Sequence, residues 1–89
     1  MTTAVPTHAE ALAVVRGELA RQLAVDVEQI PPTARVYELP EVDSMKLMAA
    51  LVAIEQRYGV TVEHSAEVVH RTIDELTAIL VTTIEGQRA

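Results

Sequence analysis

The chain has 89 residues, enough for one small domain with a single core. Apolar types make up 49% of the sequence, yet it holds two Tyr and no Phe, Trp or Cys, so the core must be aliphatic and cannot contain disulfides or thiolate metal sites. Thirteen acidic against seven basic residues give a net charge of -6, which repels the phosphates of nucleic acids and so disfavours a nucleic acid partner.

The chain begins with a short tail and an amphipathic segment. Residues 1–6 show no periodicity and no signal-peptide pattern, so we expect a flexible N-terminal tail. Thr7 and Glu10 form a Thr-x-x-Glu sequence, typical of a helix start because each side chain can bond the other's free backbone N–H. Apolar residues then recur at three- and four-residue spacing, at Leu12, Val15, Leu19 and Leu23. This spacing predicts a first helix from about Thr7 to Ala24, and Arg16 lies largely off its apolar stripe.

The segment from Val25 to Asp43 has no helical pattern. Its three prolines, Pro31, Pro32 and Pro40, remove backbone donors and restrict the residues before them. A loop of this length is usually functional or disordered. This one carries many apolar residues, namely Val25, Val27, Ile30, Val36, Tyr37, Leu39 and Val42. We therefore expect it to lie across the other helices as an ordered loop.

Ser44 to Tyr58 is predicted to be the second helix, ended by Gly59 in the left-handed conformation. Its core stripe consists of Leu47, Leu51, Ile54 and Tyr58. A second apolar stripe lies on roughly the opposite side, formed by Met45, Met48, Ala49 and Val52. A helix that is apolar on two faces is either buried all round or keeps one face for a partner.

The remainder predicts a connector, a short helix and a last helix. Residues 60–62 alternate too briefly to make a sheet, and residues 65–70 could form a short helix with modest burial. Thr72 and Glu75 form another Thr-x-x-Glu box, followed at helical spacing by Ile73, Leu76, Ile79, Leu80 and Ile84. We expect this helix to end near Gly86 and residues 87–89 to fray. The whole is an all-α fold, a small four-helix bundle of three main helices and one short helix with a long first loop.

Few residues suggest catalysis or metal binding. The three histidines show no metal-ligand spacing, and His70, among apolar neighbours, is predicted to be a partly buried packing residue. Ser44 lacks the Gly-x-Ser-x-Gly turn of a hydrolase, so the chain is not expected to be an enzyme. No apolar run approaches the ~20 residues that a membrane span requires, so we expect no membrane partner. We further expect the protein to be cytoplasmic and monomeric.

Asp43 and Ser44 allow two readings. Either residue could cap the second helix. An accessible serine at a helix N-terminus also suits a covalently attached phosphodiester, because free backbone N–H groups and the helix dipole favour an anion there.

At this point the chain resembles the acyl and peptidyl carrier proteins. The resemblance extends from about Leu12 to Ile84 and is carried by Leu39, by Val42-Asp43-Ser44-Met45, by the spacing of Leu47, Leu51 and Ile54, by Tyr58-Gly59, and by Val25, Ile30, Val62, Thr72, Ile73 and Leu76. It implies that residues 7–86 form a carrier domain in which Ser44 receives 4'-phosphopantetheine from coenzyme A through a phosphopantetheinyl transferase, with Asp43 beside it. An acyl or aminoacyl loading enzyme and later biosynthetic enzymes would then be partners.

Two departures from the family pattern bear on function. Many members have Gly three residues before the serine, where this chain has Glu41 after Pro40, so the approach to Ser44 is expected to be stiffer or differently shaped. Carriers of primary fatty acid synthesis typically bear acidic residues where this chain has Lys46 and Ala49. With Met45, Met48, Ala49 and Val52 as the docking surface and Glu41 beside it, apolar contact should dominate, which favours a polyketide or nonribosomal peptide pathway. The alternative is an unmodified helical adaptor that binds a partner through the same apolar face.

Overall fold

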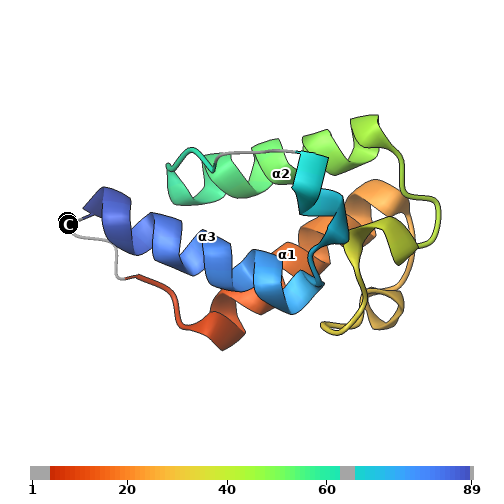
Figure 1. Ribbon diagram of the computed structural model, residues 1–89, viewed down its shortest axis with the longest axis horizontal. Coiled ribbons are helices and arrows are strands. Elements are labelled where there is room, and N and C mark those ends of the chain that lie inside the picture. Colours follow the sequence, from red (N-terminus) through yellow and green to blue (C-terminus); the bar gives the residue numbers. More distant parts are fainter. Residues whose placement is uncertain (1–4, 63–65, 89) are drawn as a thin grey trace.

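Three α-helices make up most of the chain in a computed structural model that describes residues 5–62 and 66–88 (Figure 1). They are α1 (His8–Leu23), α2 (Ser44–Tyr58) and α3 (Ile73–Arg88), joined by the 3-10 helices η1 (Val27–Gln29), η2 (Val36–Glu38) and η3 (Ala66–His70). Among the described residues no β-strand forms, and an isolated bridge pairs Arg35 with Thr72. The prediction of an all-α fold with three main helices, one short helix and a long first loop is confirmed.

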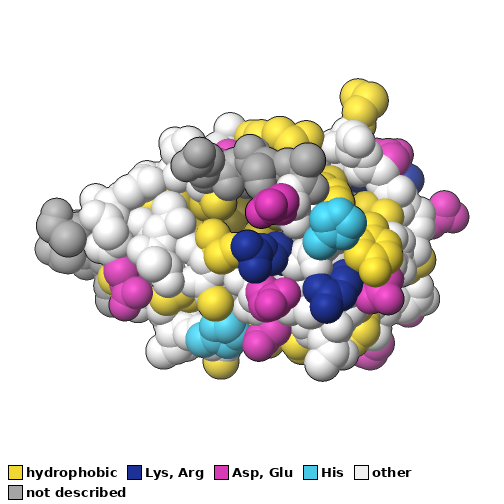
Figure 2. Space-filling model, in the orientation of Figure 1, with side chains coloured by type: hydrophobic (Ala, Val, Ile, Leu, Met, Phe, Trp, Pro, Cys, Tyr) yellow, Lys and Arg dark blue, Asp and Glu magenta, His cyan; other side chains and the backbone are white. Residues whose placement is uncertain are grey.

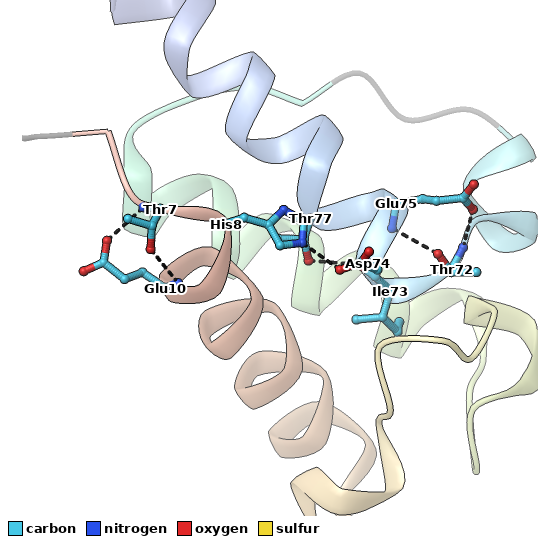
Figure 3. Close-up of polar contacts among 8 residues, drawn as sticks. All are labelled: Thr7, His8, Glu10, Thr72, Ile73, Asp74, Glu75 and Thr77. Carbon is cyan, nitrogen blue, oxygen red and sulfur yellow. Dashed lines mark hydrogen bonds and ion pairs between the residues drawn. The ribbon is translucent and has the colours of Figure 1, made fainter.

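Both predicted capping boxes are present (Figure 3). At the start of α1, the Thr7 N–H donates to the Glu10 carboxylate at 2.8 Å, and the Glu10 N–H donates to the Thr7 hydroxyl at 3.1 Å. Thr72 and Glu75 repeat this exchange at 2.8 and 3.0 Å where α3 begins. These side chains satisfy backbone donors that have no partner inside the helix, which is why both helices start where the sequence indicates.

The helix ends agree with the prediction in α1 and α2 and differ in α3. Gly59 closes α2 with φ 66°, and Ala24 closes α1 in the same left-handed region with φ 58°. The expected end of the last helix near Gly86 is wrong, because α3 continues to Arg88. Gln87, expected to fray, instead exchanges two hydrogen bonds with the backbone of Thr61: its side-chain amide donates at 2.8 Å and accepts at 3.3 Å. Contact with Thr61, in the connection that follows α2, therefore accompanies the extension of α3 past its glycine.

The core lies between the three α-helices, and the buried side chains of the described residues are aliphatic apart from Thr77. The helices contribute Ala11, Val15, Leu19, Ala20, Leu23, Leu47, Ala50, Leu51, Ile54, Ile73, Leu76, Leu80 and Ile84. Thr77 is fully buried, and its hydroxyl donates to the Ile73 carbonyl of its own helix at 2.8 Å. The buried polar group is thus satisfied without a partner from another helix.

The long loop between α1 and α2 is ordered and packs onto the helices, as expected. Ile30, Val36 and Leu39 are buried in the core. Of the apolar residues from which an ordered loop was expected, Val27 and Tyr37 do not join the core, since their side chains are 39% and 53% exposed. Each belongs to a 3-10 helix of a single turn, which can direct only some of its side chains inward.

Hydrogen bonds attach this loop to α1 on one side and to the start of α3 on the other. Arg16 donates from Nε to the Ile30 carbonyl at 2.7 Å and from a terminal guanidinium nitrogen to the Val27 carbonyl at 3.0 Å. The Ile73 N–H donates to the Ala34 carbonyl at 2.9 Å. In Figure 1 the loop therefore covers one end of the helices, next to η3, and delivers the chain to the first residue of α2.

The connection from α2 to α3 is only partly described. Val60 and Val62 are buried. Val68 and Val69 in η3 are half-buried, which agrees with the modest burial predicted for this short helix. His64 and Ser65 lie outside the described residues, as do residues 1–4 of the expected tail. The prediction of a partly buried His70 is wrong: its ring is exposed and meets the edge of Tyr37, with 5.6 Å between ring centroids. Among the described residues, no helix has the length and apolar character needed to cross a membrane.

Candidate functional site

The N-terminus of α2 shows which of two adjacent residues caps the helix. Asp43 is the N-cap, with extended backbone angles, and its carboxylate accepts a hydrogen bond from the Lys46 N–H at 2.7 Å. Its carbonyl accepts the first intrahelical bond, from the Leu47 N–H at 3.0 Å. Asp43 therefore performs the capping role that either residue could have taken.

Ser44 is the first residue of α2 and is exposed. Because Asp43 supplies the cap, the Ser44 hydroxyl has no hydrogen-bond partner among the described residues. The backbone N–H groups of Ser44 and Met45 also lack partners in this part of the chain. A nucleophilic oxygen thus lies beside two free donors at the positive end of a helix of 15 residues, an arrangement that suits a phosphate group.

The turn before Ser44 has an unusual backbone conformation. Glu41 has φ 61°, in the left-handed region that residues with a Cβ rarely adopt. The Lys46 ammonium donates to the Glu41 carbonyl at 3.2 Å and so spans the turn from the first turn of α2. Glu41 occupies the position where many carriers have glycine, and its backbone here has the conformation that glycine favours.

One face of α2 packs into the core, and the other carries exposed apolar side chains. Leu47, Ala50, Leu51 and Ile54 are buried. Met45 is 84% exposed, Met48 44% and Val52 41%, and Ala49 is also exposed. Figure 2 shows hydrophobic side chains along the edge where α2 lies and one that stands clear of the surface. The second helix is therefore not buried all round: its second apolar face is exposed to solvent.

The last residue of the predicted core stripe is less buried than the others. Tyr58 is half-buried, and this partial burial raises the pKa of its phenol above the ordinary value of 10.0. The neighbouring Arg57 charge opposes the shift.

The described histidines lie apart from Ser44 in other contacts. His8 Nε2 lies 2.6 Å from an Asp74 carboxylate oxygen, joining the first turns of α1 and α3 (Figure 3). His70 contacts Tyr37. Among the described residues there is also no group of three or more His, Asp or Glu side chains that could hold a metal ion.

The surface also has a charged hollow, which the sequence did not predict. It has a volume of about 340 Å³ and is lined by Arg35, Glu67, His70, Arg71 and Glu75 (Figure 2). Glu75 has a lowered pKa, chiefly because its carboxylate accepts the Thr72 N–H, with smaller contributions from the two arginines. The arginines are separated by 36 positions, so no local motif could have indicated the cluster.

The fold and the N-terminus of α2 define a small helical domain with an exposed serine placed to hold a phosphate-linked group. Residues 13–80 match the family described as "Phosphopantetheine attachment site". The chain is also 34% identical over 64 residues, which is 72% of each chain, to the acyl carrier protein MbtL of Mycolicibacterium paratuberculosis. No solved structure gives a significant match. The chain belongs to the phosphopantetheine-binding carrier protein family.

Family membership establishes the general chemistry. The cofactor is 4'-phosphopantetheine, and a carrier of this family is not itself catalytic. Such carriers interact with a phosphopantetheinyl transferase and with biosynthetic enzymes.

Proposed function

We propose that Ser44 carries the 4'-phosphopantetheine and that the chain serves as a monomeric, cytoplasmic carrier in a polyketide or nonribosomal peptide type of pathway. The observation that carries the assignment is the division of roles at the start of α2. Asp43 accepts the capping bond at 2.7 Å, which leaves the exposed Ser44 hydroxyl available. The chain itself would perform no catalysis.

The residues around Ser44 fit a phosphodiester. The unpaired N–H groups of Ser44 and Met45 can donate to phosphate oxygens, and the N-terminal end of α2 favours their negative charge. Asp43 lies beside the attachment point but has its carboxylate directed to the Lys46 N–H. When bound, the group supplies a terminal thiol on a flexible arm, to which an acyl or aminoacyl group is attached as a thioester.

The attachment site is tested by intact-mass analysis after incubation with coenzyme A and a broad-specificity phosphopantetheinyl transferase. The wild-type chain should gain one phosphopantetheine, and Ser44→Ala should gain none. Because Asp43 provides the cap, Ser44→Ala should change the free energy of unfolding by no more than about 0.5 kcal/mol. Thr33→Ala removes another exposed hydroxyl from the long loop and should be labelled like the wild type. Labelling of Ser44→Ala would show that the assignment is wrong.

We propose further that the exposed face of α2, formed by Met45, Met48, Ala49 and Val52 with Glu41 beside it, is the main surface for partner enzymes. Methionine is flexible and polarizable, and exposed apolar side chains grouped on one face are typical of a protein interface. The four side chains of this face, Met45, Met48, Ala49 and Val52, are all uncharged, which supports docking through apolar contact and hence a dedicated pathway over primary fatty acid synthesis.

The docking face is tested with charge substitutions. Met48→Lys should raise the KM of the carrier for its transferase or loading enzyme by about tenfold, because an ammonium must then be desolvated in an apolar contact. Ile79→Lys is the matched control, since Ile79 is an exposed apolar residue of α3 at 37% and should have little effect. Equal effects of the two variants would contradict the proposal. Partner binding that is weakened by Met48→Lys in a chain never modified at Ser44 would instead support the adaptor function.

A further inference from the structure

The hydrogen bond between Lys46 and Glu41 joins two of the positions at which this chain departs from the usual carrier sequence. Lys46 is half-buried, and its ammonium donates to the Glu41 carbonyl at 3.2 Å. Its backbone N–H donates to Asp43 at 2.7 Å. One residue of the first turn of α2 thus contacts both ends of residues 41–43, which connect the turn formed by residues 39–42 to Ser44.

This turn has an energetic reason to need such a contact. Glu41 has φ 61°, and the left-handed conformation is disfavoured by roughly fivefold or more in population for a residue with a Cβ. The backbone bond that closes the turn, from the Val42 N–H to the Leu39 carbonyl, is long at 3.4 Å. A charge-assisted hydrogen bond to the Glu41 carbonyl can offset a preference of that size.

We propose that Lys46 is a positioning residue, whose bond to the Glu41 carbonyl holds the turn in its left-handed conformation and presents Ser44 to the phosphopantetheinyl transferase. The inference rests on Ser44 being the attachment site. Lys46 in this role substitutes for a glycine, because glycine adopts the left-handed region without help whereas Glu41 requires an added contact.

A different role for Lys46 would be a direct contact with the partner enzyme. The two roles make different predictions when Glu41 is replaced. If Lys46 only holds the turn, Glu41→Gly should make it dispensable, since the glycine backbone takes the same conformation unaided. If Lys46 binds the enzyme directly, its removal should cost the same with either residue at position 41.

The experiment measures phosphopantetheine transfer from coenzyme A by a broad-specificity transferase, with the chain as the varied substrate. The variants are Lys46→Met, Glu41→Gly and the double variant. Methionine keeps the unbranched stem of lysine and removes the amine. Arg57→Met is the control: it removes one positive charge from the same helix, about 16 Å further along its axis.

Lys46→Met should raise KM by about fivefold with kcat nearly unchanged, because the free chain then presents the competent turn less often. Glu41→Gly also removes a carboxylate beside the docking face, so the effect of Lys46→Met is measured relative to each background, wild type or Glu41→Gly. Adding Lys46→Met to Glu41→Gly should raise KM by less than about twofold. Arg57→Met should leave KM unchanged. A fivefold loss in both backgrounds, or no loss from Lys46→Met, would overturn the positioning role while leaving Ser44 as the attachment site. No transfer to the wild-type chain would overturn both proposals.

Hydrogen exchange provides a readout that does not depend on the transferase. The Val42 amide proton closes the turn, so Lys46→Met should speed its exchange by about fivefold, and the same substitution in Glu41→Gly should have little effect. Unchanged exchange in Lys46→Met would show that the bond does not hold the turn.

Discussion

Arg16 fastens the long loop to α1, and its replacement should destabilise the whole domain. Its guanidinium donates to two loop carbonyls, those of Ile30 at 2.7 Å and Val27 at 3.0 Å. Ile30 is fully buried, so the first of these bonds fixes the backbone of a core residue. Arg16→Ala would remove both donors together with the aliphatic stem of the side chain.

The expected loss in free energy of unfolding is about 2 kcal/mol. Hydrogen bonds from charged groups contribute about 1.5 to 3 kcal/mol; the bond to Ile30 is partly buried, whereas the bond to Val27 is exposed and therefore weaker. A domain of this length has a stability of about 4 to 13 kcal/mol. The substitution should therefore lower Tm by about 8 to 16 °C. Urea unfolding followed by circular dichroism measures the change.

Two further variants make the measurement specific. Arg21→Ala removes a more exposed arginine of the same helix, which pairs with Glu18, and should cost less than about 0.5 kcal/mol. Arg16→Lys keeps the charge but loses the forked geometry, and should fall between the two. If Arg16→Ala were no more destabilising than Arg21→Ala, burial of Ile30 alone would hold the loop and the reasoning would be refuted.

Three other substitutions test single features of the fold. Gly59→Ala should lower the free energy of unfolding, measured by chemical denaturation, by about 1 kcal/mol, because no atom crowds the added Cβ and only the φ of 66° penalises it. Gly17→Ala, within α1, should instead raise the free energy of unfolding. A change of the same sign in both variants would contradict this account. Burial raises the pKa of Tyr58, so the unfolded chain loses the phenolic proton first and stability should fall as pH rises above 10.0. Tyr58→Phe should reduce this loss of stability at alkaline pH. An unchanged pH dependence of stability in that variant would exclude Tyr58 as its source. The Thr72 N–H lowers the pKa of Glu75, so the contribution of this carboxylate to stability is present above the ordinary pKa of 4.5 and is lost as pH falls through the folded-state pKa. Glu75→Gln should therefore make stability depend less on pH in the acid range. An unchanged acid dependence of stability in that variant would rule out the capping box as the cause.

Much of the fold could be predicted from local sequence because its signals are local. The spacing of apolar residues in α1 and α2, the two Thr-x-x-Glu boxes and the left-handed Gly59 each involve residues a few positions apart. Such signals survive without knowledge of the tertiary structure. The end of α3 could not be predicted from local signals, because the bonds between Gln87 and Thr61 join residues 26 positions apart.

The residues of the candidate site could be predicted from the sequence, whereas the identity of the helix cap required the structure. Ser44 and the exposed stripe of Met45 and Met48 follow from motif and periodicity. Which of Asp43 and Ser44 caps the helix depends on the extended backbone of Asp43, with φ -145° and ψ 171°, and not on residue type, because both types cap well.

By itself, the sequence determined the helices, the aliphatic core and the position of a serine suited to a phosphodiester, because these depend on residue type and short-range spacing. Only the tertiary structure decided that Arg16 holds the loop, that Val27 and Tyr37 stay exposed, and that Lys46 spans the turn at Glu41. Each of these depends on the path of a 20-residue connection between α1 and α2, which no periodic pattern encodes. Its side-chain directions are fixed by hydrogen bonds and burial between residues distant along the chain.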